Sequence, residues 1–273
     1  MVGQIYHLPG SFDRFMLVWA LLALPVVYLL RSSVAGVFYL AASTAWAFDR
    51  MDFGNQELWY WALLAGVLPL CWSNLRSNRY GASTAFLGWA VALALGIGTG
   101  LTLVRAVPGL WIIIFCAWSA IFLLVDQRWL REVPSVAQRP FLVFGVAGAL
   151  GMMMALTFEQ PWQEIGWDHY RQLGAPWRQA LDPVLALALA GMAVALLVGQ
   201  RKNLKPSRVA LGLLPVVSIG AFALAASFDR TGQAMVLFNL YALATGLLLR
   251  TDGFRHVKTG DVNAGLLTVG ALV

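Results

Sequence analysis

Long stretches without ionisable side chains constrain the fold of this chain more than any other feature. Nine stretches of sixteen residues or more contain no Lys, Arg, Asp, Glu or His. A helix needs about 17–25 residues to cross roughly 30 Å of hydrocarbon, and continuous rather than alternating hydrophobicity favours helices over barrel strands. We therefore predict an all-α fold, a polytopic transmembrane helical bundle in one membrane domain (1–273). The predicted spans are 15–30, 32–48, 58–75, 80–104, 106–125, 140–158, 183–200, 209–228 and 231–249.

Overall composition agrees with this class. Sixty per cent of the 273 residues are hydrophobic and the mean hydropathy is +0.71, well above the range of soluble domains. A last apolar run, 262–273, has twelve residues and spans only about 18 Å as a helix, so we expect a partial span or a fragment of a longer chain. Cys71 and Cys116 fall in separate spans and are interpreted as packing residues.

The distribution of charge predicts the orientation of the chain. If the nine spans alternate in direction, one set of connections holds thirteen of the nineteen basic residues and four acids, for a net charge of +9. The opposite set holds six arginines and nine acids, for a net charge of −3. Basic connections remain in the cytoplasm, so we expect the N-terminus outside. The basic set is Arg31, Arg76, Arg79, Arg128, Arg131, Arg139, Arg201, Lys202, Lys205, Arg208, Arg250, Arg255 and Lys258.

Small residues and prolines suggest how the spans pack. Gly96 and Gly100 form a GxxxG pair in the fourth span, and 145, 148 and 151 are all Gly in the sixth. Such residues let helices approach closely, most simply within the molecule and alternatively at a face for a partner. Pro25, Pro69 and Pro215 are expected to kink their spans because each removes a main-chain donor.

The longest predicted outer connection, 159–182, reads EQPWQEIGWDHYRQLGAPWRQALD. Its aromatic and aliphatic residues recur at near-helical spacing, with acids, an arginine and glutamines between them. This pattern predicts an amphipathic helix lying in the outer interface, with its three tryptophans at the depth that tryptophan favours. Two alternatives are a lid over a cavity and a docking segment for another protein.

The predicted spans carry only mild polarity. They hold hydroxyl side chains and one deep amide, Asn239, which is more simply a contact between helices than a ligand group. The absence of ionisable groups in the spans argues against a proton relay through buried carboxylates and against bis-histidine haem. No nucleotide-binding, nucleophile or metalloprotease motif occurs, so we predict no catalytic residue, no metal site and no cofactor.

Two water-facing clusters remain as candidate sites. On the predicted outer side, Glu164 and Asp168 share one helix face and His169 is displaced from them by about 100°. These residues could form a metal or acid/base site, but a second nearby histidine is missing. On the inner side, Arg201, Lys202, Lys205 and Arg208 could hold anionic lipid headgroups. The positive-inside bias alone would also place these four basic residues there.

The N-terminal sequence GQIYHLPGSFDRFMLVWALLALPVVYLLRS (3–32) resembles a family of uncharacterised bacterial proteins, predicted multi-pass inner-membrane proteins that carry a "domain of unknown function" label. The matching elements are Gln-Ile-Tyr-His, Pro-Gly, an Asp and the WALLALP helix. The later FNLYALATGLLLR (238–250) is similar to the C-terminal span of that family. The resemblance implies a bacterial inner-membrane location and no catalytic residues. It also draws attention to Tyr6, His7 and Asp13 as an outer-face cluster.

Together these features favour an accessory or scaffold subunit that packs against membrane lipids, partner membrane proteins or further copies of itself, with no nucleic-acid partner. The competing class is a transporter or lipid-handling protein with an uncharged pathway lined by Ser, Thr and Asn239. An enzyme using the outer-face acids ranks third. A polar cavity reaching mid-membrane would favour transport, whereas a solid bundle would favour the scaffold.

Overall fold

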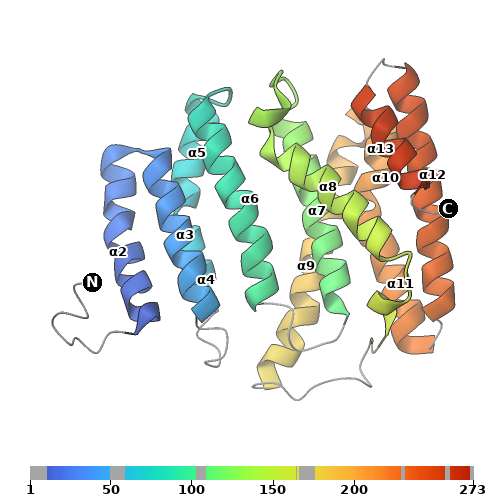
Figure 1. Cartoon of the computed structure of the whole chain (residues 1–273), viewed down its shortest axis with the longest axis horizontal. Coiled ribbons are helices and arrows are strands. Elements are labelled where there is room, and N and C mark those ends of the chain that lie inside the picture. The colour runs from blue at the N-terminus through green and yellow to red at the C-terminus, as the bar shows by residue number, and fades with distance from the viewer. Residues whose placement is uncertain are drawn as a thin grey trace. The chain divides into compact units, whose positions relative to one another are not determined.

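The computed structural model describes residues 11–49, 59–102, 109–163, 165, 176–228, 231–255 and 259–270, and all regular secondary structure in these ranges is helical (Figure 1). Five helices are long and apolar enough to cross a membrane. Four of them are α2 (Phe12–Leu30), α6 (Ala82–Thr102), α7 (Leu110–Trp129) and α12 (Thr231–Arg255), and the fifth covers most of α9 (Pro176–Gln200). The all-α class and several membrane-compatible helices are thus confirmed.

A sixth span results if α10 (Pro206–Gly212) and α11 (Leu214–Phe228), which meet at a bend of 42°, are taken together. The break lies at Leu213, two residues before Pro215, as expected where a proline cannot donate to the preceding turn. The predicted third span is likewise broken into α4 (Trp59–Ala65) and α5 (Leu68–Ser77), with Pro69 in the first turn of α5. In contrast, α2 continues through Pro25 without interruption.

The sequence predicts one domain, whereas the contacts of the chain divide it into two compact units. The first unit comprises 1–103 and 133–140, and the second comprises 104–132 and 141–273. In the first unit, α2 packs against α3 (Ser33–Asp49), and α3 packs against α6. The short 3-10 helix η2 (Val136–Gln138) is held to α6 because Trp89 Nε1 donates to the carbonyl of Ala137 across 2.9 Å.

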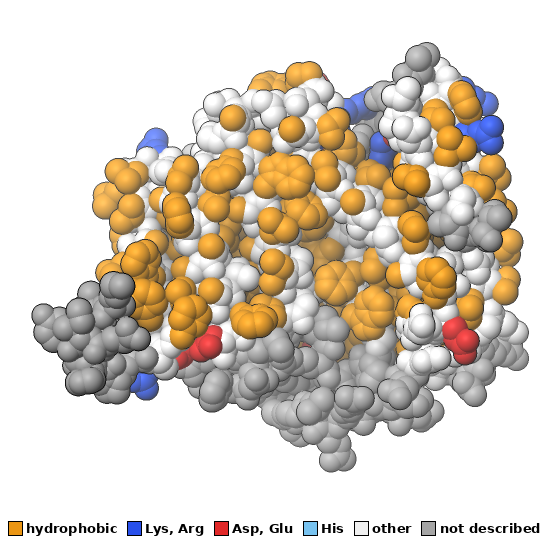
Figure 2. Space-filling view, in the orientation of Figure 1, with side chains coloured by type: hydrophobic (Ala, Val, Ile, Leu, Met, Phe, Trp, Pro, Cys, Tyr) orange, Lys and Arg blue, Asp and Glu red, His pale blue; other side chains and the backbone are white. Residues whose placement is uncertain are grey.

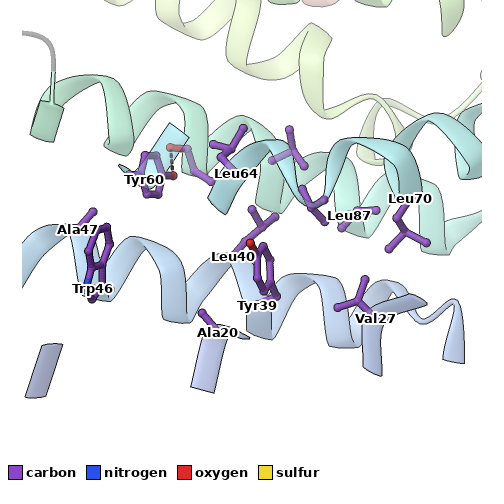
Figure 3. Close-up of a cluster of buried hydrophobic side chains, with 13 residues drawn as sticks. Ala20, Val27, Tyr39, Leu40, Trp46, Ala47, Tyr60, Leu64, Leu70 and Leu87 are labelled. Carbon is purple, nitrogen blue, oxygen red and sulfur yellow. Dashed lines mark hydrogen bonds between the residues drawn. The ribbon is translucent and has the colours of Figure 1, made fainter. Parts of the chain in front are cut away.

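The core of the first unit contains two fully buried tyrosines, Tyr39 and Tyr60 (Figure 3). The break between α4 and α5 interrupts the regular helical hydrogen-bond pattern, and tyrosine hydroxyls bond to carbonyls beside it. Tyr39 donates to the carbonyl of Leu63 at 2.5 Å, and Tyr28 donates to that of Gly66. The break in the third span is therefore stabilised from neighbouring helices rather than by solvent.

Gly98 is the glycine of α6 that permits close packing. A Cβ atom there would lie 2.0 Å from Cε1 of Tyr60, whereas a Cβ on Gly96 would meet no atom within 4 Å. Tyr60 in turn donates to the carbonyl of Ala94 at 2.6 Å, which fixes its ring against this helix. The close approach in the fourth span thus lies at Gly98 and not at the Gly96 position of the predicted GxxxG pair.

In the second unit, the central helix is α7. In its apolar 18-residue stretch, 72% is buried inside the protein. It packs against α9 and α11, and α11 packs against α12. The helix α8 (Pro140–Ala155) crosses α7 at two glycines: a Cβ on Gly145 would lie 2.5 Å from the main-chain nitrogen of Leu123, and one on Gly148 would lie 2.6 Å from Oγ of Ser119 (Figure 1). The predicted packing role is thus seen at Gly145 and Gly148, whereas Gly151 has open space around it.

The last helix, α13 (Thr259–Gly270), includes much of the predicted partial span and packs antiparallel against α12. Gly253 lies beside Val262, and Gly246 lies beside Val269, so the two helices form a hairpin. Gly265 makes the closest approach: a Cβ there would be 2.6 Å from the carbonyl oxygen of Gly246.

The described part of the predicted outer amphipathic segment is not one continuous helix. Gln160–Trp162 form a 3-10 turn, η3, and Gln163 is extended. Trp162 is 1% exposed, donates from Nε1 to the carbonyl of Leu156 at 2.9 Å, and packs 5.6 Å from the ring of Phe238. The ring of Trp162, which was predicted at the outer interface, is thus buried in the core of the second unit. Residues 176–182 belong to α9 instead of the connection.

Candidate functional site

The described Lys and Arg side chains of the second unit gather where α7, α9 and α12 end. Figure 2 shows its Lys and Arg side chains at the end where α12 and α13 are joined. Three segments far apart in the sequence meet there: 126–131, 199–208 and 250–261. We call this region the basic end. All three segments belong to the connections that the charge distribution assigned to the basic set.

A cavity of about 280 Å³ opens at the basic end between the last turns of α7 and α9. Its lining contains two guanidinium groups and three amides but no carboxylate. We call it the arginine cavity, and its lining residues are Gln127, Arg128, Arg131, Gly199, Gln200, Asn203 and Leu204.

Hydrogen bonds within the arginine cavity occupy main-chain acceptors. Gln200 donates from Nε2 to the carbonyls of Leu124 at 3.2 Å and Leu196 at 3.3 Å. Arg131 donates from Nη1 to the carbonyl of Asn203 at 3.5 Å, a long contact. The carbonyls of Leu124 and Leu196 lie near the C-terminal ends of α7 and α9, and that of Asn203 ends η5. Gln200 and Arg131 thus occupy these acceptors, and the guanidinium group of Arg128 and the remaining N–H groups of Arg131 are left as donors.

The four basic residues predicted as one headgroup site separate into two groups. Arg201 and Lys202 are exposed in the 3-10 turn η5 (Arg201–Asn203) that follows α9. Arg208 is instead 14% exposed and its Nη2 lies 2.9 Å from Oδ1 of Asp261 at the start of α13. Lys205 precedes α10 with its ammonium nitrogen buried. The chain therefore uses Arg208 to hold α13.

A second interaction at the basic end caps α10. Pro206 is the first residue of this helix and has no N–H, so the N–H of Ser207 is the first that needs an acceptor. Oδ2 of Asp252, on α12, accepts it at 2.9 Å. Asp252 is buried, and its negative charge at a helix N-terminus is favourable. Sequence analysis assigned Asp252 only to a connection and did not predict this cap.

The structure brings together little of the predicted outer-face cluster. Asp13 lies in the first turn of α2, where an acid complements the helix dipole, and it is only 4% exposed. The other predicted members, Tyr6, His7, Glu164, Asp168 and His169, lie outside the described residues. Within the described ranges, no three His, Cys, Asp or Glu side chains come together as metal ligands.

Most described hydroxyls in the apolar helices bond to their own helix. Thr99 donates to the carbonyl four residues earlier at 2.6 Å, and Thr102 does the same at 2.7 Å. Ser43, Thr44, Ser119 and Ser218 make equivalent bonds to carbonyls three or four residues earlier. A hydroxyl in this arrangement has used its proton locally. Asn239, the deep amide, lies half-buried in α12 without a hydrogen bond to another described side chain.

The first unit has a cavity of a different character. A groove of about 400 Å³ between α3 and α6 is almost entirely apolar, and Thr44 contributes its only hydroxyl side chain. That hydroxyl donates to the carbonyl of Leu40 at 2.8 Å. The groove is suited to aliphatic groups and has no means of holding a polar solute.

Arg128 and Arg131 are the charged lining residues of the arginine cavity, and sequence analysis did not single them out. They were counted in the basic set, but they lie about 70 residues before Gln200 and Asn203 in the sequence. Only the hydrogen bonds between these segments show that they are neighbours in space. Arg128 lies in the last turn of α7, and Arg131 follows in the turn just after the helix ends at Trp129. Their i,i+3 spacing is the one local signal available.

No family model matches the chain, and neither a curated protein nor a solved structure is similar to it at a significant level.

Proposed function

We propose that this chain is an integral membrane scaffold: nine spans, N-terminus outside, located in a bacterial inner membrane and packing against lipids and partner membrane proteins. The observation that carries the proposal is that most described hydroxyls within the apolar helices bond to their own helix. Thr99, Thr102 and Ser119, each buried, bond to carbonyls of their own helices instead of lining a wet path.

The exposed surface of α2 supports the same role. Trp19, Leu22 and Leu29 are 60%, 67% and 82% exposed, which is unfavourable in water and favourable against lipid or another helix. The face of the first unit seen in Figure 2 is largely hydrophobic. A helix that packs on one side against α3 and presents large apolar side chains on the other is suited to a lateral contact within the membrane.

The ends of each unit support the proposed orientation. In the first unit, Asn74 Nδ2 donates to Oγ of Ser33 at 3.1 Å, which joins the connections containing Arg31 and Arg76. In the second unit, Arg208 and Asp261 join two further basic connections. Alternating spans require this pairing of basic connections at one end.

Isolation from native membranes tests the scaffold. The full chain, tagged and extracted with surrounding lipid in a polymer disc, should co-purify with a stoichiometric membrane partner or as an oligomer. A variant with Leu22→Ser and Leu29→Ser, on the exposed side of α2, should lose that partner. The control Val18→Ala keeps the surface apolar and should retain it. A monomeric protein without partner that moves a solute across proteoliposomes would instead support the uncharged-pathway transporter.

A further inference from the structure

We propose that the arginine cavity at the basic end binds a phosphate group. Its seven lining residues supply two guanidinium groups, three amides and no acid, in a volume of about 280 Å³. One water occupies about 30 Å³ of liquid, so the cavity has room for a phosphate group with part of a headgroup. Planar guanidinium groups bind phosphate through paired hydrogen bonds, which makes them the side chains of choice for this ligand.

The two arginines carry charge that the protein does not neutralise within hydrogen-bond range. Arg128 lies over the ring of Trp129, 5.4 Å from its centroid, and Arg131 bonds to a main-chain carbonyl. Neither forms an ion pair with a described carboxylate. Arg208, only a few residues beyond the cavity in sequence, does have such a partner in Asp261. Of these three arginines, Arg208 is paired with a described carboxylate, whereas Arg128 and Arg131 are not.

A cation is the poorer occupant of this cavity. The carbonyls of Leu124, Leu196 and Asn203 would attract a cation, but Gln200 and Arg131 already donate to all three. A cation would also have to approach two positive side chains without any lining carboxylate to offset the repulsion. An anion instead meets donors from Arg128 on α7, from Arg131 just after that helix and from Asn203 after α9.

The apolar surface beside the cavity points to one source of the phosphate. Val198 precedes the lining residue Gly199 and is exposed, and Leu204 contributes an aliphatic side chain to the lining. Leu187, eleven residues before Val198 and on the same side of α9, is exposed as well. A phospholipid could place its phosphate in the cavity and its tails on this surface, whereas inorganic phosphate or a phosphorylated solute would use the cavity alone.

Native mass spectrometry of the full chain in non-ionic detergent tests the proposal. The chain is titrated separately with phosphatidylglycerol, with diacylglycerol, which has the same tails but no phosphate, and with inorganic phosphate. Retention of phosphatidylglycerol but not of diacylglycerol supports the site with a lipid source. Saturable binding of inorganic phosphate that displaces the lipid supports a phosphate site whose ligand comes from solution. Equal retention of phosphatidylglycerol and diacylglycerol, with no phosphate binding, would overturn it.

Two double variants with the same change in charge separate the cavity from general electrostatic attraction. Arg128→Gln with Arg131→Gln should weaken binding by about tenfold or more. Arg201→Gln with Lys202→Gln removes two charges from exposed positions outside the lining and should change it less than about twofold. Equal losses in both would contradict the proposal.

A third variant distinguishes a binding defect from a folding defect. Arg128→Lys with Arg131→Lys keeps the charge but loses the paired donors. Its affinity for the ligand should therefore lie between those of the native protein and the glutamine variant. All three should unfold at nearly the native temperature, because these side chains are exposed. If the lysine variant folds and binds as tightly as the native chain, the paired-donor site is wrong.

Discussion

Oδ2 of Asp252 accepts a hydrogen bond from the main-chain N–H of Ser207 across 2.9 Å, although 45 residues separate the two in the sequence. The contact fixes the start of α10 against α12. Beside it, the ion pair between Arg208 and Asp261 fixes the start of α13 against α10. Three helices of the second unit are therefore joined by two polar contacts at one end.

Replacing Asp252 should loosen α10. In Asp252→Ala the buried N–H of Ser207 loses its acceptor, which should cost about 1–2 kcal/mol of stability. Asp252→Asn keeps an oxygen acceptor without the charge, so its stability should lie between those of the native protein and Asp252→Ala. Hydrogen exchange of the Ser207 amide in detergent measures the effect, with unchanged protection in α6 as the internal control. Equal protection in all three proteins would show that Asp252 does not cap α10.

Breaking the ion pair should release α13. Asp261→Asn and Arg208→Gln should each destabilise the docked helix by about 1–3 kcal/mol, because both partners are mostly buried, 14% and 15% exposed. Arg255→Gln, at an exposed position in the last turn of α12, is the matched control. Limited proteolysis near 256–258 should accelerate in the two pair variants only. If the double variant is destabilised no more than either single variant, the two residues act as a coupled pair.

The α12–α13 hairpin should be sensitive to side-chain size at one glycine. Gly265→Ala places a Cβ 2.6 Å from the carbonyl oxygen of Gly246 and 2.8 Å from the nitrogen of Arg250, both main-chain atoms that cannot move independently. We expect a loss of about 1–3 kcal/mol. Gly260→Ala in the same helix meets no atom within 4 Å and should be neutral or stabilising by up to about 1 kcal/mol. Thermal unfolding in detergent compares them, and a Gly265→Ala protein as stable as Gly260→Ala would contradict the hairpin packing.

The first unit offers a similar matched pair. Gly98→Ala should destabilise α6, since the new Cβ would lie 2.0 Å from the buried ring of Tyr60, which is fixed by its bond to Ala94. Gly96→Ala should leave the stability unchanged or raise it. The expected difference is about 1–3 kcal/mol between two alanines that are two residues apart. If Gly96→Ala were the less stable of the two variants, the close helix contact would lie on the Gly96 face instead.

Helix content could be predicted from the sequence because hydrophobic runs of spanning length are a strong and local signal. The breaks near Pro69 and Pro215 could also be located, since proline removes a donor wherever it occurs. Pro25 did not break its helix, and nothing in the local sequence distinguishes it from the other two. Whether a proline bends a helix or only interrupts one bond depends on neighbours such as Tyr28 and Tyr39, which bond to the carbonyls beside the α4–α5 break.

The candidate site was less accessible to sequence reasoning. The cluster of basic residues in 201–208 is obvious in the sequence, yet Arg208 has a structural partner and the cavity takes its charge from Arg128 and Arg131. Likewise, the near-helical spacing around Trp162 suggested an interfacial helix, whereas this ring is buried against Phe238. Both differences arise from contacts between distant segments, which periodicity and spacing do not encode.

Sidedness of the basic end is the most direct test of the proposed membrane arrangement. Single cysteines are introduced by Arg201→Cys and, in the predicted outer connection, by Gln163→Cys, both exposed positions, in a background of Cys71→Ala and Cys116→Ala. A membrane-impermeant maleimide applied to intact cells should label the Gln163→Cys protein at once and the Arg201→Cys protein only after permeabilisation. Labelling of Arg201→Cys from outside intact cells, or labelling of both from the same side, would contradict the arrangement.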